Sequence, residues 1–178
     1  HGRRGFPSCD AVAMAIETRD EYFMDRALQA AAEAGRLGEV PIGAVLVHEG
    51  EIVAVTANRR ERDNDPTAHA EVLALRIGGG VLGTWRLMEC TLYVTLEPCP
   101  MCMGACINGR VGRLVFACRD QKAGAAVSCY EMGTDDRLNH RIVITEGVRK
   151  QAASAVLTTF FASLRTRGRQ IAADAASG

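Results

Sequence analysis

The sequence has no apolar run long enough to cross a membrane, no internal repeat and no low-complexity tract. Its longest strongly apolar run, PIGAVLV at 41–47, is far shorter than the roughly 20 residues that a membrane-spanning helix needs. The first 20 residues lack an apolar stretch leading to a small-residue cleavage site, so we expect no signal peptide. With 178 residues, of which 48% are hydrophobic and 24% charged, the chain is expected to fold as one soluble domain.

A cysteine pattern suited to a disulfide framework is also missing. The chain has seven cysteines, an odd number, and a single CxxC pair formed by Cys99 and Cys102. In a chain without an export signal, this pattern favours metal or thiol chemistry over disulfides. We interpret the other five as small core residues: Cys9, Cys90, Cys106, Cys118 and Cys129.

Neither sign of charge is in excess, because 21 Lys and Arg residues balance 21 Asp and Glu residues. The distribution is uneven. Residues 1–109 hold 10 basic and 15 acidic side chains, whereas residues 110–169 hold 11 and 5. A basic C-terminal section is a weak indication of a phosphate-bearing substrate. A solvated charged surface explains it equally well.

The spacing of apolar and turn residues predicts alternating helices and strands. We expect helices at 20–36, from Pro66 onward, from Pro98 to about Asn108, and from about Val148 to Arg165. We expect a hairpin at 41–58 that turns at Glu49-Gly50, strands at 91–96, 113–118 and 141–147, and a glycine-rich break at 78–80. This order favours an α/β fold with three layers, α/β/α, in which helices cover both faces of one mixed sheet.

The segment DPTAHAEVLAL at 65–75 places His69 and Glu71 two residues apart where a helix begins. Two such residues point about 200° apart on an ideal helix. They converge only if His69 lies in the entry turn and the longer Glu71 reaches back beside it. Taken alone, the segment is more simply explained as a capped helix with one solvated histidine and one first-turn glutamate.

The segment TLEPCPMCMGA at 95–105 changes that assessment. Pro98 and Pro100 suit the first turn of a helix, which puts Cys99 and Cys102 on one face at its N-terminus. There the helix dipole favours the thiolate that a metal requires. Because both helices follow strands, His69 and the two cysteines are able to lie at one edge of the sheet. A His/Cys/Cys set with a neighbouring Glu is typical of the catalytic zinc of nucleobase deaminases.

Two other interpretations of the cysteines explain less of the sequence. A redox-active CxxC leaves His69 and Glu71 unexplained. A structural zinc closed by Cys106 is disfavoured, because Cys106 lies about 6 Å further along the helix from Cys102.

The chain resembles bacterial tRNA-specific adenosine deaminases, which convert the wobble adenosine of a tRNA anticodon to inosine. The resemblance runs from about Asp20 to Leu164 and includes EVPIGAVLV, DPTAHAE, CTLYVTLEPCPMC, GRVGRLVFACRDQKAGAA and LNHRIVITEG. It implies a cytidine-deaminase-like fold, one catalytic Zn²⁺ per chain, a homodimer, a cytoplasmic location without membrane contact, and a tRNA anticodon stem-loop as partner. It divides the chain into an N-terminal extension at 1–19, a zinc-dependent deaminase domain at 20–166 and a flexible tail at 167–178.

The same resemblance implies roles for individual residues. His69, Cys99 and Cys102 correspond to the zinc ligands and Glu71 to the proton shuttle. The expected substrate-binding residues are Asn58, Ala70, Asp120, Phe160 and Phe161. Core packing is an equally good explanation for one of the two phenylalanines.

Two alternative functions remain open from the sequence. The PCPMC form at 98–102 also occurs in bacterial guanine deaminases, which share the fold and act on a free base, whereas GRVGRLVFACRDQKAGAA favours the tRNA enzyme. A zinc-bearing binding module, in which Glu71 has no catalytic role, is the third hypothesis.

Overall fold

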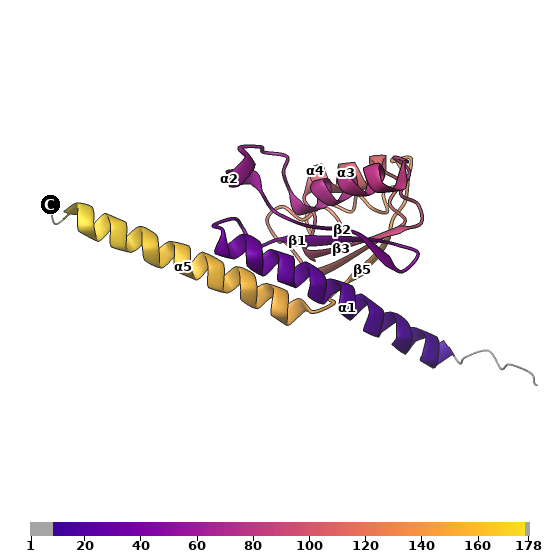
Figure 1. Ribbon diagram of the computed structural model, residues 1–178, viewed down its shortest axis with the longest axis horizontal. Coiled ribbons are helices and arrows are strands. Elements are labelled where there is room, and N and C mark those ends of the chain that lie inside the picture. The colour runs from indigo at the N-terminus through magenta and orange to yellow at the C-terminus, as the bar shows by residue number, and fades with distance from the viewer. Residues whose placement is uncertain (1–8, 177–178) are drawn as a thin grey trace, which may run out of the picture.

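The computed structural model describes residues 9–176 and shows a three-layer α/β/α arrangement (Figure 1). Helices α3 and α4 cover one face of the sheet, and α1 and α5 cover the other. The fold class predicted from the sequence is confirmed. The elements in chain order are α1 (Cys9–Arg36), β1 (Gly43–His48), β2 (Glu51–Ala57), α2 (Arg60–Asp63), α3 (Ala70–Leu82), β3 (Cys90–Leu96), α4 (Pro100–Asn108), β4 (Arg113–Cys118), β5 (Val143–Glu146) and α5 (Lys150–Ala176).

The five strands form one mixed sheet in the order β2-β1-β3-β4-β5. Strand β1 pairs antiparallel with β2 and β3, whereas β3, β4 and β5 run parallel. The predicted hairpin turn is present, with positive φ at both Glu49 (50°) and Gly50 (84°), as a two-residue hairpin turn requires. The parallel arrangement places the ends of β3 and β4 at the same edge of the sheet.

Alternating strand residues divide the core between the two faces. Leu92 and Leu114 belong to the cluster under α3 and α4. Tyr93 and Val115 belong to the cluster under α1 and α5. All four are buried. Because neighbouring strand residues point to opposite faces, apolar residues at consecutive positions are needed to cover a sheet that is buried on both sides.

Four predicted element boundaries are wrong. The helix expected from Pro66 onward begins only at Ala70. Helix α1 begins at Cys9 rather than at residue 20, and α5 continues to Ala176, past the predicted end at Arg165 and through most of the expected flexible tail. The helix after Pro66 does not break at 78–80 but runs to Leu82. Gly78 is buried against the sheet, where an added Cβ would lie 2.1 Å from Leu46 Cδ2. The close approach of α3 to β1 therefore explains a glycine inside the helix.

No helix in the described part of the chain is both long and apolar enough to span a membrane.

Candidate active site

His69 and Glu71 occupy the start of α3, as the sequence predicts. His69 is the N-cap residue and has an extended backbone, with φ −77° and ψ 147°. Glu71 is the second residue of the helix and is only 4% exposed. The two side chains are close enough for the charge of each to affect the pKa of the other, so they share one site.

Cys99 and Cys102 occupy the start of α4. Cys99 is the N-cap residue, Pro100 takes the first helical position, and Cys102 is fully buried. Proline fits there because the first amide of a helix has no intrahelical acceptor. Helix α4 follows β3 closely, and α3 follows β2 after a connection that contains the short helix α2. The two helix starts meet, because atoms of His69 lie within 3.7 Å of the sulfurs of Cys99 and Cys102.

The three ligand atoms form a compact triangle. Cys102 Sγ lies 3.5 Å from His69 Nδ1, Cys99 Sγ lies 3.7 Å from the same nitrogen, and the two sulfurs are 3.6 Å apart. A tetrahedral ion with Zn–S of about 2.3 Å and Zn–N of about 2.0 Å needs edges of about 3.5–3.8 Å. The residues therefore fit Zn²⁺, and three protein ligands leave a fourth position for water or substrate. Among the described residues, this is the only cluster with metal-ligand spacing.

The interpretation of the remaining cysteines is partly confirmed. Cys90, Cys106 and Cys118 are buried, and Cys106 is outside the ligand cluster. Cys129 is exposed, so its assignment to the core is wrong. It lies in the loop between β4 and β5, where its Sγ contacts the carbonyl of Gln121. The side chain of Cys9 lies outside the described residues.

The environment of the two thiols differs. The pKa of Cys99 is lowered to about 4, first by a hydrogen bond from Cys102 and also by His69. The same hydrogen bond and burial raise the pKa of Cys102, and the bond to Cys99 raises the pKa of His69. Burial raises the pKa of Glu71. A carboxyl group with a raised pKa is suited to both accepting and donating a proton.

Two buried side-chain polar atoms among the described residues have no hydrogen-bond partner, and both belong to predicted site residues. They are Oε2 of Glu71 and Oδ1 of Asn58. Asn58 is 4% exposed and directly follows β2, where the connection to α3 begins. The two ends of this connection are joined by the hydrogen bond that the Arg59 amide donates to the Ala68 carbonyl at 3.0 Å. Because an unpaired buried acceptor is costly, both atoms are candidates to receive a hydrogen bond from a ligand.

The other predicted substrate residues are not all together. Asp120 and Phe161 line one groove of about 460 Å³, together with Leu96 at the end of β3. Phe160 instead lines a separate groove between α1 and α5, although the centroids of the Phe160 and Phe161 rings are 5.5 Å apart. Ala70 is buried, and its carbonyl accepts a hydrogen bond from Thr56.

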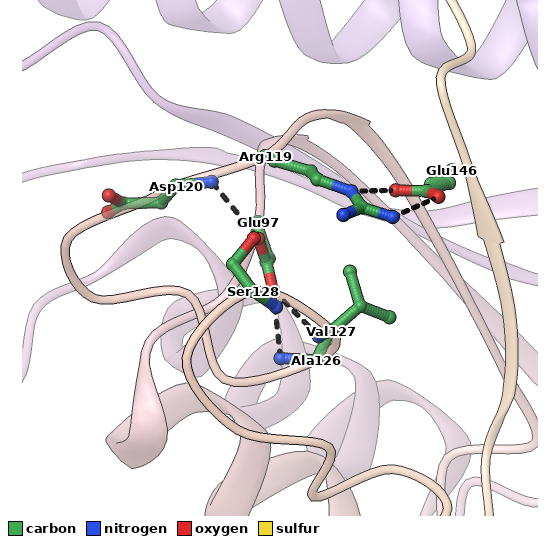
Figure 2. Close-up of polar contacts among 7 residues, drawn as sticks. All are labelled: Glu97, Arg119, Asp120, Ala126, Val127, Ser128 and Glu146. Atoms are coloured by element: carbon green, nitrogen blue, oxygen red, sulfur yellow. Dashed lines mark hydrogen bonds and ion pairs between the residues drawn. The ribbon is translucent and has the colours of Figure 1, made fainter.

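One residue near the site was missed by sequence reasoning. Glu97, between β3 and Cys99, is buried, and its carboxylate accepts hydrogen bonds from four backbone amides and a hydroxyl (Figure 2). Burial alone raises the pKa of Glu97, but the hydrogen bonds from Ser128 and the backbone outweigh it and lower the pKa. The available signal was an acidic residue between a buried strand and Pro98.

Comparison with known proteins agrees with this geometry. Residues 17–118 match the family model described as the cytidine and deoxycytidylate deaminase zinc-binding region. The chain is 44% identical to a tRNA-specific adenosine deaminase of Bacillus subtilis (strain 168) over 150 residues, which is 84% of this chain and 93% of the relative.

Solved structures also resemble the fold. One from work on A-to-I editing by tRNA:A34 deaminases at the wobble position of transfer RNA has a TM-score of 0.74 and 40% identity, covering 76% of this chain and 99% of that one. Guanine deaminase from Bacillus subtilis has a TM-score of 0.54 and 44% identity, covering 56% of this chain and 64% of that one. The chain therefore belongs to the zinc-binding cytidine and deoxycytidylate deaminase family, and within it to the tRNA-specific adenosine deaminases.

Proposed function

We propose that this protein hydrolytically deaminates adenosine to inosine at the wobble position of a tRNA anticodon and releases ammonia. The observation that carries the proposal is the buried carboxylate of Glu71, whose Oε2 has no partner, next to a triangle of ligand atoms that fits Zn²⁺. The tRNA substrate is supported by curated relatives that are 40–45% identical over more than four fifths of this chain.

The chemistry divides between the ion and the chain. His69, Cys99 and Cys102 would hold Zn²⁺, which would supply Lewis acidity and lower the pKa of a water molecule toward neutrality. Oε2 of Glu71 accepts the proton of the attacking water and delivers it to N1 of the adenine as oxygen adds to C6. Glu71 then accepts the proton of the new C6 hydroxyl and passes it to the exocyclic nitrogen, which leaves as ammonia while the C6 carbonyl of inosine forms. Burial raises the pKa of the Glu71 carboxyl group. This suits the shuttle, because the group must both accept and donate a proton in each turnover.

The proposed substrate contacts come from two regions, around the start of α3 and in the groove beside β3. Asn58, with its buried and unpaired Oδ1, is proposed to hydrogen-bond the target nucleoside. Ala70 shapes the pocket floor between the zinc ligand and Glu71. Asp120 and Phe161 share the groove beside β3 and are proposed to contact nucleotides that flank the target. Phe160, which faces α1, is proposed to support Phe161 from behind.

Four further parts of the proposal rest on the family resemblance. The bound part of the tRNA is the anticodon stem-loop, whose unpaired bases are cheap to extrude. The protein acts as a homodimer, and it works in the cytoplasm because its proposed substrate is there. Residues 20–166 form the deaminase domain, although α1 begins before it and α5 continues beyond it.

A guanine deaminase activity is the second candidate, because the PCPMC segment and the likeness to the Bacillus subtilis guanine deaminase both allow it. Fold similarity alone separates the two candidates poorly, because a guanine deaminase from Nitrosomonas europaea has a TM-score of 0.69 against 0.74 for the tRNA:A34 deaminase structure. Sequence favours the tRNA enzyme, since identity is 40% for the tRNA:A34 deaminase structure and 26% for that guanine deaminase. A zinc-bearing binding module is disfavoured because it gives the unpaired, buried Glu71 carboxylate no use.

The decisive experiment is to incubate a tRNA pool with the zinc-loaded protein and sequence the anticodon loops. Adenosine at the wobble position should be read as guanosine, and the Glu71→Gln protein should leave the pool unchanged. Ammonia release from free guanine that is faster than from tRNA would establish the guanine deaminase instead. Absence of ammonia release from either substrate would favour the binding module.

A further inference from the structure

The carboxylate of Glu97 is enclosed by the loop at 119–128, which connects β4 toward β5. Oε1 accepts the backbone amides of Ala126, Val127 and Ser128 at 3.1, 2.8 and 2.9 Å. Oε2 accepts the backbone amide of Asp120 at 3.0 Å and the Ser128 hydroxyl. Figure 2 shows the loop curving around the carboxylate from both sides. A set of converging backbone amides is a strong anion cradle.

The packing of the loop matches this cradle. The amide of Ala125 donates to the carbonyl of Pro98 at 2.8 Å, which adds a second attachment beside Glu97. Gly124 lies so close that an added Cβ would be 2.3 Å from Glu97 Oε2 and 2.5 Å from the Asp120 carbonyl. The loop therefore fits the Glu97 carboxylate only with glycine at this position.

Asp120 is held in a defined orientation by the same contacts. Its amide donates to Glu97, and its Oδ1 accepts the amides of Lys122 and Ala123 at 2.9 and 3.2 Å. Figure 2 shows the Asp120 side chain directed away from Glu97. That side chain lines the groove with Phe161. The other anchor near this point, the ion pair of Arg119 with Glu146, is exposed on both sides, 47% and 41%, and such pairs hold little free energy.

We propose that Glu97 is a positioning residue for substrate recognition. It attaches the 119–128 loop to the segment just before α4, so that Asp120 borders the groove at a fixed position relative to the zinc ligands. The identity of the substrate in this statement rests on the proposed function, whereas the anchoring of the loop does not. Glu97 itself touches neither substrate nor metal.

Replacement by glutamine tests this anchoring selectively. A glutamine side chain has one acceptor oxygen, and the three amides around Oε1 will retain it. Its NH₂ group then faces the amide of Asp120 and the hydroxyl of Ser128. The hydroxyl can rotate to accept, but the Asp120 amide cannot, so Glu97→Gln releases Asp120 while leaving most of the cradle bonded.

The experiment combines two measurements on zinc-loaded proteins. Hydrogen exchange of the 119–128 segment should become faster in Glu97→Gln, with the Asp120 amide losing most protection. KM for a tRNA anticodon stem-loop should rise about tenfold, the usual effect of one lost buried hydrogen bond, while kcat changes less than threefold. Gly124→Ala, which displaces the loop without changing charge, should raise KM in the same way.

Glu146→Gln is the matched control, because it removes the same charge from the other attachment of the loop. It should leave exchange within 119–128 and KM near wild type. Loss of zinc from Glu97→Gln, or faster exchange with unchanged KM in both loop variants, would overturn the positioning role. If the wild-type protein does not deaminate tRNA, the proposed function fails, and the exchange data still decide whether Glu97 anchors the loop.

Discussion

Asp20 of helix α1 and Arg113 of strand β4 form a two-point ion pair, with the guanidinium nitrogens 2.8 and 2.7 Å from the two carboxylate oxygens. The Asp20 side chain is only 6% exposed, and it also accepts the hydroxyl of Tyr93 at 2.8 Å. Residues 93 positions apart in the chain are thereby joined under the sheet. The pair fixes how α1 lies against β3 and β4.

Asp20→Asn should therefore destabilise the protein by about 2–4 kcal/mol, because it leaves a half-buried guanidinium with a neutral partner. Urea unfolding at neutral pH measures this difference. Glu21→Gln is the control, since Glu21 pairs with Arg149 at the surface, and its loss should change the unfolding free energy by less than about 1 kcal/mol. Equal effects of the two variants would contradict the importance of the Asp20 contact.

Gly43 should not tolerate alanine, because an added Cβ would lie 2.0 Å from the Ala27 carbonyl oxygen in α1. We expect Gly43→Ala to cost about 1–3 kcal/mol through displacement of the helix. Gly80→Ala is the opposite case: the residue is exposed within α3, nothing lies within 4 Å of its added Cβ, and alanine should stabilise by about 0.5–1 kcal/mol. Thermal unfolding of both variants provides the check.

The purified protein should contain about one zinc per chain. His69→Ala and Cys99→Ala should lose both zinc and deaminase activity, because two remaining ligands hold the ion poorly. Cys106→Ala should retain the metal, since Cys106 is outside the ligand cluster. Elemental analysis beside an ammonia assay measures both properties. Full activity in a chelated, metal-free sample would sink the zinc mechanism.

Glu71→Gln should separate binding from chemistry. The variant keeps the ligand triangle and the shape of the pocket but removes the proton shuttle, so we expect normal zinc content and tRNA affinity. Turnover should fall by about 10²–10⁴-fold or more, the usual contribution of a positioned acid–base group. Single-turnover deamination of a stem-loop is the appropriate assay, and near-normal rates would mean that another group moves the proton.

The exposed end of α5 should contribute to the salt dependence of tRNA binding. Arg165, Arg167 and Arg169 are exposed there, and each phosphate contact lowers log K by about 0.7–0.9 per tenfold increase in salt. Changing all three to glutamine should raise KM several-fold and flatten the salt slope, with little effect on kcat. The triple lysine variant keeps the charge and should retain the slope. An unchanged slope in the glutamine variant would remove this surface from the tRNA footprint.

The metal cluster and the fold class could be predicted from sequence because both depend on local rules. The two prolines before and within CPMC place Cys99 and Cys102 at a helix start, and the order of helices and strands indicates a sheet covered on both faces, although both helices begin a few residues later than predicted. Family resemblance, rather than periodicity, supplied Asn58 and Asp120.

The rest depended on contacts between distant segments. Gly78 reads as a helix breaker until the proximity of Leu46 is known, and Glu97 reads as an ordinary loop residue until the 119–128 loop closes around it. The placement of Phe160 and Phe161 in different grooves similarly depends on how α5 packs against α1 and β4. No local pattern encodes such distances.

The pairing of the two terminal helices on one face of the sheet has a consequence for synthesis. Arg149, at the start of α5, bonds to Asp25 of α1 at 2.9 Å, so this layer lacks half of its parts until the end of the chain emerges. Helices α3 and α4, which form the layer that carries the zinc ligands, both lie before residue 119. At about 5–20 residues per second, the ribosome needs several seconds to make the remainder. The three zinc ligands, His69, Cys99 and Cys102, are therefore synthesised before the helix that completes the layer on the opposite face.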